Sequence, residues 1–208
     1  GTLNTTGIAW GVTLSTDGNT AYVADYTEGL QIIDISTPSS PTLLGTFDTS
    51  GWAQGVTISS DGYTAYVADG SLGLQIIDVS NPAAPSLLAT LNTIGNALGV
   101  TISTNGNTAY VADDSEGLRI IDITNSTAPS LLGTYNTIGN VGGVTVSTNG
   151  YTAYVADGSA GLQIIDIPNL DLYSFIDEGV FTGDYDAADG NSILISDEAT
   201  YIHPDTIY

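Results

Sequence analysis

The sequence predicts an all-β fold, a β-propeller of four-stranded antiparallel blades, from its internal repetition and its composition. The segment GVTLSTDGNTAYVADYTEGLQIIDIS starts at Gly11, and near-copies start at Gly55, Gly99 and Gly143, so the period is 44 residues. The repeat is rich in Val, Ile, Thr and Tyr and contains no helical pattern. A β-rich unit of about 40 to 50 residues has the size of one propeller blade.

Turn signals divide each repeat into four short runs that we expect to be strands. Several runs are apolar on both faces, so each predicted sheet needs a cover on both sides. Sheets stacked face to face around an axis provide that cover. In the first repeat the runs are Gly11–Ser15, Thr20–Asp25, Leu30–Ser36 and Leu43–Thr49.

Three positions recur in every regular repeat, and each predicts a structural role. The glycine that opens the first run is expected where strands crowd the axis and a side chain would collide. The aspartates that end the second and third runs are expected to be buried and to accept backbone N–H bonds from a neighbouring turn. These sets are Gly11, Gly55, Gly99, Gly143; Asp25, Asp69, Asp113, Asp157; and Asp34, Asp78, Asp122, Asp166.

The repeats predict five blades within a single domain of residues 1–208. Residues 178–208 form a degenerate fifth copy, because Asp189–Asp197 matches the pattern of Asp17–Asp25. The four regular repeats are residues 11–54, 55–98, 99–142 and 143–177, the last with a fourth strand expected at about Leu170–Asp177.

The degenerate copy lacks a fourth strand, and the start of the chain offers one. Gly1–Thr5 resembles Gly45–Thr49, which ends a regular blade. We therefore expect residues 1–10 to complete the last blade and to protect its open edge. The blade completed in this way belongs either to the same chain or to a neighbouring subunit. In the second case head-to-tail contacts would build a homo-oligomer or a filament.

The charge balance excludes several classes of partner. The chain has 23 acidic residues, a single basic residue, Arg119, and a formal net charge of −22. Phosphate backbones and anionic lipid surfaces attract clustered Lys and Arg, so we expect no nucleic-acid binding. No stretch approaches the roughly 20 apolar residues of a membrane span, so we expect no membrane insertion. The absence of Cys and Met agrees with an extracellular location.

The third run, Leu30–Asp34, with the preceding AYVAD and the following Ser/Pro segment, resembles the LVIVD-repeat family of bacterial and archaeal cell-surface proteins. The resemblance covers residues 11–177. It implies a β-propeller exported to the cell surface, in a family whose functions are mostly unassigned and often considered adhesive.

Catalysis would have to depend on carboxylates, because the chain has one His, one Arg and no Lys or Cys. Glycosidases place an acid and a base carboxylate on both sides of the substrate. The runs expected to line the axis carry none, and Asp184 and Asp186 both belong to the degenerate blade. We therefore expect no enzyme, with a carboxylate-based glycosidase as the weakest alternative.

One acidic turn has the spacing of a metal site. Asp184, Asp186 and Asp189 lie close together before Gly190, and calcium binds several oxygen atoms from such a tight loop. The alternative is an acidic hairpin turn, in which Asp-Gly is common. Calcium is the one cofactor that the sequence suggests.

Other candidate sites are polar or aromatic. Asn4 and Asn125 start glycosylation sequons. Trp10 and Trp52 lie in loops and offer contacts to a ligand such as a sugar, although packing between blades is the alternative. Arg119 replaces a Gln of the other repeats, and we expect it to pair with a nearby acid.

The leading hypothesis is an extracellular, non-enzymatic structural or adhesive repeat protein that self-assembles in a surface layer or filament. Near-identity of the copies favours it, because a scaffold needs the same packing in every repeat whereas a catalytic site needs local departures. The alternative is a propeller that binds glycans or another ligand at the mouth of its channel.

Overall fold

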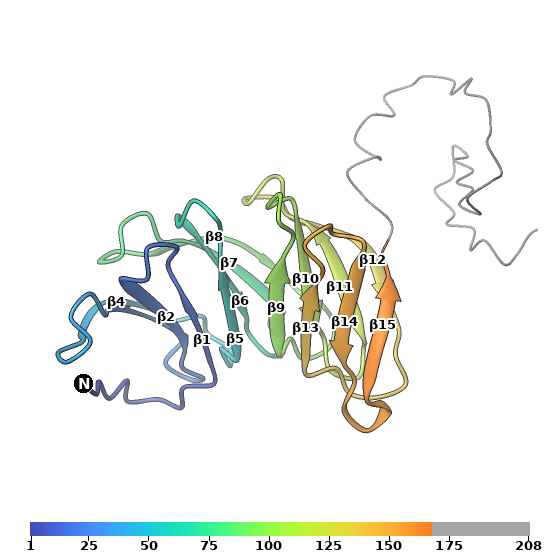
Figure 1. Ribbon diagram of the computed structural model, residues 1–208, viewed down its shortest axis with the longest axis horizontal. Helices are drawn as coiled ribbons and strands as arrows, with labels where there is room; N and C mark the ends of the chain where they lie inside the picture. The colour runs from blue at the N-terminus through green and yellow to red at the C-terminus, as the bar shows by residue number, and fades with distance from the viewer. Residues whose placement is uncertain (168–208) are drawn as a thin grey trace, which may run out of the picture. The chain divides into compact units, whose positions relative to one another are not determined.

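Each repeat folds into one antiparallel sheet in the computed structural model, which describes residues 1–167 (Figure 1). The strands follow one another in chain order within the sheets, as β1-β2-β3-β4, β5-β6-β7-β8, β9-β10-β11-β12 and β13-β14-β15. These sheets are blades 1 to 4, and they confirm the predicted propeller architecture. The expected fourth strand of blade 4 and the degenerate fifth copy, with Asp184, Asp186 and Asp189, lie outside the described residues.

The strand bounds agree with the runs expected from the sequence to within about two residues. The first strands are β1 (Gly11–Leu14), β5 (Gly55–Ile58), β9 (Gly99–Ile102) and β13 (Gly143–Val146). The second strands are β2 (Thr20–Ala24), β6 (Thr64–Ala68), β10 (Thr108–Ala112) and β14 (Thr152–Ala156). The third are β3 (Leu30–Asp34), β7 (Leu74–Asp78), β11 (Leu118–Asp122) and β15 (Leu162–Asp166). The outer strands are β4 (Thr42–Phe47), β8 (Ser86–Leu91) and β12 (Ser130–Tyr135), and a single helical turn, η1, spans Gly158–Ala160.

The hydrophobic core lies between consecutive blades. We call the face of a blade that turns toward the preceding blade its leading face, and the opposite one its trailing face. Side chains alternate between the two faces along each strand, so strands that are apolar throughout supply both. Residues of the trailing face of blade 1 pack against residues of the leading face of blade 2, and the next two joints repeat the pattern. At the first joint the two sets are Tyr22, Ala24, Leu30, Ile32 and Val56, Ala65, Val67, Ile77.

The first strands of consecutive blades lie side by side, and their opening glycines allow this close approach. A Cβ atom on Gly11 would lie 2.7 Å from the carbonyl oxygen of Gln54, and one on Gly55 would lie 2.9 Å from that of Leu98. Any side chain there would push two backbones apart. The role predicted for these glycines is confirmed at Gly11 and Gly55, and the approach is looser at Gly99, at 3.3 Å. At Gly143, with no described blade beyond it, a Cβ atom would meet nothing within 4 Å.

We expect Gly55→Ala to lower the free energy of unfolding by about 1–3 kcal/mol, because overpacking against backbone atoms cannot be relieved by a rotamer change. Gly133→Ala is the matched control, because a Cβ atom there meets nothing within 4 Å and blade 2 already carries Ala89 at that repeat position. Urea titrations of both variants measure the difference. Equal effects of the two substitutions would contradict the close approach at the axis.

Candidate functional site

A fully buried aspartate joins each blade to the linker that precedes it. Asp69 follows β6 directly and accepts a hydrogen bond from the Thr49 hydroxyl, while Asp113 follows β10 and accepts one from Thr93. The backbone N–H of Gly95 also donates to Asp113, at 3.2 Å. The carboxylate therefore fixes the chain where it passes from one blade to the next. This confirms the structural role expected for the aspartate that ends the second run.

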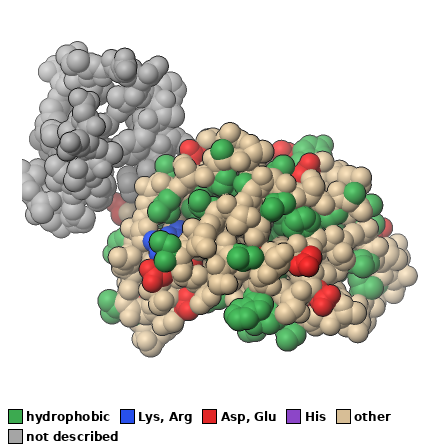
Figure 2. Space-filling view, turned by 180° about the vertical axis from the view of Figure 1, so that it is seen from behind, with side chains coloured by type: hydrophobic (Ala, Val, Ile, Leu, Met, Phe, Trp, Pro, Cys, Tyr) green, Lys and Arg blue, Asp and Glu red, His purple; other side chains and the backbone are tan. Residues whose placement is uncertain are grey.

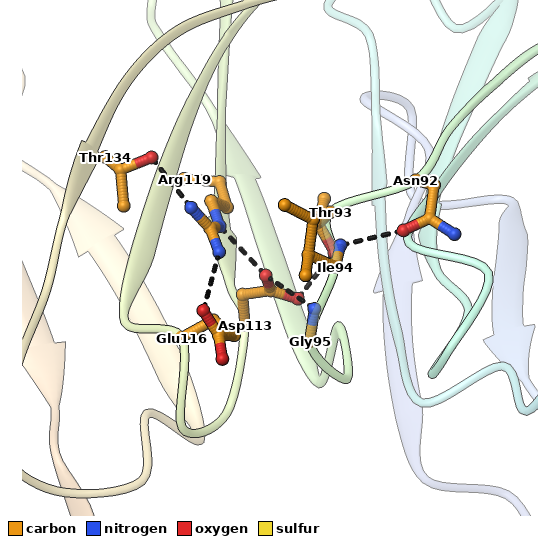
Figure 3. Close-up of polar contacts among 8 residues, drawn as sticks. All are labelled: Asn92, Thr93, Ile94, Gly95, Asp113, Glu116, Arg119 and Thr134. Atoms are coloured by element: carbon orange, nitrogen blue, oxygen red, sulfur yellow. Dashed lines mark hydrogen bonds and ion pairs between the residues drawn. The ribbon is translucent and has the colours of Figure 1, made fainter.

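In blade 3 the buried aspartate is part of an ion pair (Figure 3). The Arg119 guanidinium, 6% exposed, donates from Nε to Asp113 at 2.9 Å. Its other nitrogens donate to the Thr134 hydroxyl at 2.8 Å and to the Glu116 carboxylate at 3.2 Å. The expected pairing of Arg119 with an acid is confirmed, and the buried charge of each partner is compensated.

Blade 2 has no cation at this position. Gln75 replaces the arginine, and its Nε2 lies 3.4 Å from Asp69 Oδ2. Burial disfavours the ionised carboxylate and raises the pKa of Asp69 to about 6, although hydrogen bonds from Thr49, Gln75 and Gly51 oppose the shift. Two blades with the same fold therefore hold the same carboxyl group in different electrostatic environments.

The aspartates that end the third strands behave differently from the expectation in one respect. Asp34 accepts the backbone N–H of Ser36 at 2.8 Å, and Asp78 and Asp122 make the equivalent bond to residues 80 and 124. Accepting a turn N–H was predicted correctly. Their burial was predicted wrongly. Asp34, Asp78 and Asp122 are half-buried and Asp166 is exposed, because each lies at a strand end beside an exposed turn.

Residues 1–7 contact blade 1 in the same way that the linker after a blade contacts the next blade. The Thr5 hydroxyl and the Gly7 N–H donate to Asp25 at 2.8 and 3.2 Å, which matches the bonds of Thr93 and Gly95 to Asp113. Leu3 packs against the leading face of blade 1. A polar cavity of about 270 Å³ lies beside this segment. Residues 1–10 form no strand within the described part, and their partner in the predicted fifth blade lies outside it, so the blade completion stays a prediction.

The two outermost faces of the described blades expose side chains whose repeat equivalents are buried. On the trailing face of blade 4 Ile164 is 66% exposed, whereas its equivalent Ile76 in blade 2 is 0% exposed. On the leading face of blade 1 Val12 is 66% exposed, whereas Val56 in blade 2 is 9% exposed. We call these two surfaces the end faces. Each has the chemistry of a blade joint.

An aromatic cluster joins three loops around blade 1: Trp10 precedes β1, Tyr26 lies between β2 and β3, and Trp52 lies in the linker to blade 2. The Tyr26 ring stacks on Trp52 with centroids 5.5 Å apart and planes inclined by 15°, and it lies 6.3 Å from the ring of Trp10. Trp10 is 62% exposed and Trp52 is 50% exposed, so at least half of each indole surface faces solvent. The structure thus brings together the two tryptophans suggested as ligand contacts. Sequence reasoning missed Tyr26, although its repeat equivalents Gly70, Asp114 and Gly158 marked it as a departure.

The remaining candidate sites are surface positions. Asn4 and Asn125 are both exposed, and Asn125 Oδ1 accepts a bond from the Thr127 hydroxyl at 2.8 Å, so glycosylation there stays a prediction. Within residues 1–167 no three acidic, His or Cys side chains are grouped to hold a metal. Acidic and hydrophobic side chains are interspersed on the view in Figure 2, and the small blue area belongs to Arg119, the chain's single basic residue. No helix in the described part is long and apolar enough to cross a membrane.

Stacked four-stranded sheets with joints of this kind define a β-propeller architecture. The LVIVD repeat model matches residues 6–49, 50–93, 94–137 and 138–171. The chain therefore belongs to the LVIVD-repeat family. Comparison with curated proteins gives no match.

Solved structures with a similar fold are distant in sequence. Kuenenia stuttgartiensis hydrazine synthase is 20% identical, with a TM-score of 0.65 over 80% of this chain and 49% of that one. The Myceliophteria thermophila Cps50 (Swd1) β-propeller domain is 13% identical, with a TM-score of 0.64 over 80% and 54%. U3-55K is 13% identical, with a TM-score of 0.67 over 80% and 51%. The chain spans about half the length of these structures, and the likeness establishes the fold alone.

We expect Gln75→Arg to change how stability depends on pH. Because the folded pKa of Asp69 exceeds the ordinary value of 3.8, the folded protein binds more protons between pH 4 and 6. This contribution to stability is present below pH 4 and is lost as pH rises through 6. An arginine beside Asp69 favours the ionised form, so the variant should gain roughly 1–2 kcal/mol relative to wild type between pH 4 and pH 8.

The control is Arg119→Gln, which removes the cation beside Asp113 and should change the pH dependence with the opposite sign. Urea unfolding at both pH values measures each difference. A difference between wild type and Gln75→Arg that does not depend on pH would show that Asp69 does not titrate in this window.

Proposed function

We propose that the chain is an extracellular, non-enzymatic structural module whose copies associate head to tail through their end faces. The observation that supports it most directly is the exposure of Ile164 and Leu162. Where a blade follows, the equivalents of Leu162 are buried in every case, and those of Ile164 are buried in blades 1 and 2 and partly buried in blade 3. The assembly contact is then a further blade joint, made between two chains.

The two end faces are complementary because the chain itself contains three examples of the joint. The trailing face of blade 3 packs on the leading face of blade 4 through Leu118, Val155 and Ile165. Blade 4 and blade 1 carry the same residue types at the equivalent positions, in Leu162 and Val23. A trailing face and a leading face are different surfaces, so the contact is heterologous, and it closes into a ring or continues as a filament.

Residues 1–7 add a specific element to this contact. Thr5 and Gly7 lie against blade 1 where the linker after a preceding blade's outer strand would lie, since they bind Asp25 as Thr93 and Gly95 bind Asp113. Blade 4 has three strands in the described part. In the proposed assembly, residues 1–7 of one copy pair with the last blade of its neighbour.

Composition and family support the remaining parts of the proposal. The chain has no Cys or Met, and it offers no Lys and a single His for general acid–base or nucleophilic chemistry. A surface-exposed, adhesive role agrees with membership of the LVIVD-repeat family. The net charge of −22 makes copies repel one another at long range, so association through an apolar face should strengthen as salt screens the charges.

We expect the purified chain to form head-to-tail oligomers or strings, and Ile164→Glu to reduce them to monomers. A buried, unpaired carboxylate at a joint costs several kcal/mol, whereas at an exposed position it costs little. Ile138→Glu is the matched control, since Ile138 is 94% exposed and lies outside the end faces. Sedimentation velocity over a range of protein and salt concentrations, with electron microscopy of the same samples, measures the outcome.

Deleting residues 1–7 should weaken association in the same assay. Circular dichroism and urea unfolding of each variant separate loss of assembly from loss of folding. A wild-type chain that stays monomeric at high protein and salt concentration would overturn the proposal and would favour closure within one chain.

A further inference from the structure

The aromatic cluster of Trp10, Tyr26 and Trp52 is not required by the fold. The Tyr26 backbone pairs with Ala53 in an isolated bridge, and Gly70 with Ala97 and Asp114 with Val141 make the same bridge. The same bridge is present whether the residue at this repeat position is tyrosine, glycine or aspartate. The aromatic side chains therefore contribute nothing that the other joints need.

A polar pair occupies the same place in a later joint. Where the first joint stacks Tyr26 on Trp52, the third has Asp114 accepting a hydrogen bond from Asn140. Side chains at these positions are therefore free to vary within the same backbone. Two exposed indoles and the half-buried Tyr26 ring converge at the first joint alone among the joints of residues 1–167.

Tyr26 also has an unfavourable backbone conformation. Its φ is +54°, in the left-handed region, and the equivalent position in blade 2 is Gly70 with φ +58°. A bulky residue in this region is uncommon and lowers the stability of the folded state, whereas glycine adopts the conformation freely. Such strain on a half-buried aromatic residue that belongs to no core cluster points to a functional role.

We propose that the cluster is a binding site for a neutral glycan, with pyranose rings stacked on the exposed indole faces. The C–H face of a pyranose is apolar and slightly positive, and it packs on the negative face of an aromatic ring. Trp52 and Tyr26 are nearly parallel, so they present flat faces, whereas a cage for a quaternary ammonium group needs rings that enclose the cation from several sides.

Charge selects among glycans. The nearest basic residue along the chain is also the chain's single one, Arg119, and it is buried in the joint between blades 2 and 3, on Asp113. A uronic acid or sulfated sugar would find no cation at the cluster and would meet the field of a chain with net charge −22. The site therefore favours uncharged sugars.

The cluster contains both tryptophans of the chain, so intrinsic fluorescence reports directly on the site. We expect saturable changes in emission when the full chain is titrated with at least one neutral oligosaccharide among β-linked glucose, xylose, mannose and N-acetylglucosamine oligomers of matched length. Galacturonic acid oligomers of the same length should give at least tenfold weaker binding.

Variants locate the site by calorimetry. Trp52→Ala and Tyr26→Gly should each weaken binding at least tenfold, and Tyr26→Gly should keep the fold because Gly70 has the same backbone conformation. Tyr63→Ala is the control, since Tyr63 is 60% exposed and has no ring contact with the cluster. Binding should persist in Ile164→Glu, so failure of this site and failure of assembly are separate results.

No saturable response to any neutral oligosaccharide would overturn the proposal. So would an equal loss in Tyr63→Ala, or binding of the charged oligomer as tight as that of the neutral ones.

Discussion

The packing of one blade's trailing face on the next blade's leading face is the interaction on which the rest of the structure depends. Each sheet is apolar on both sides, so a single blade would leave one face or both in water, and stability arises from the joints between repeats. The constraint explains why residues such as Leu30, Leu74 and Leu118 are identical and fully buried. It also explains the glycines at the axis, because the joint brings first strands close together.

The same constraint makes the ends of the array its distinctive chemical feature. At an interior joint two neighbouring blades bury each other's apolar faces. The outer face of a terminal repeat has no such neighbour, so it needs a polar cap, a closing blade or another molecule. Val12 and Ile164 show that neither end of the described array carries a polar substitution on its exposed face. The described array, residues 1–167, therefore has an apolar surface of the joint type at both of its ends, and the proposed association rests on these two surfaces.

The sequence predicted those features that depend on local periodicity. Strand order, strand bounds, the axial glycines and the turn bonds of Asp34 follow from a pattern repeated at fixed spacing. Contacts between different loops were not predictable. Tyr26 and Trp52 are an example, because they are 26 residues apart and belong to no common run. The partner of Arg119 was equally undetermined, since Asp113 and Glu116 both lie within reach, and the structure shows that the guanidinium binds both. The half-burial of Asp34 depends on how open the turn beside it is, which a strand pattern does not specify.

The most regular positions of the repeat and its aromatic departures lie on different surfaces of the described blades. The blade joints tolerate little variation, so departures from the repeat accumulate where side chains leave the joint, as at Trp10, Tyr26 and Trp52. A head-to-tail array would display one such cluster per copy at a fixed spacing. Stacking of a single sugar on an exposed indole is weak, but several sites on one array engage a polymeric glycan together, and the effective concentration of the second site multiplies the affinity of the first. The proposed assembly and the proposed binding site would then reinforce each other without any contact between them.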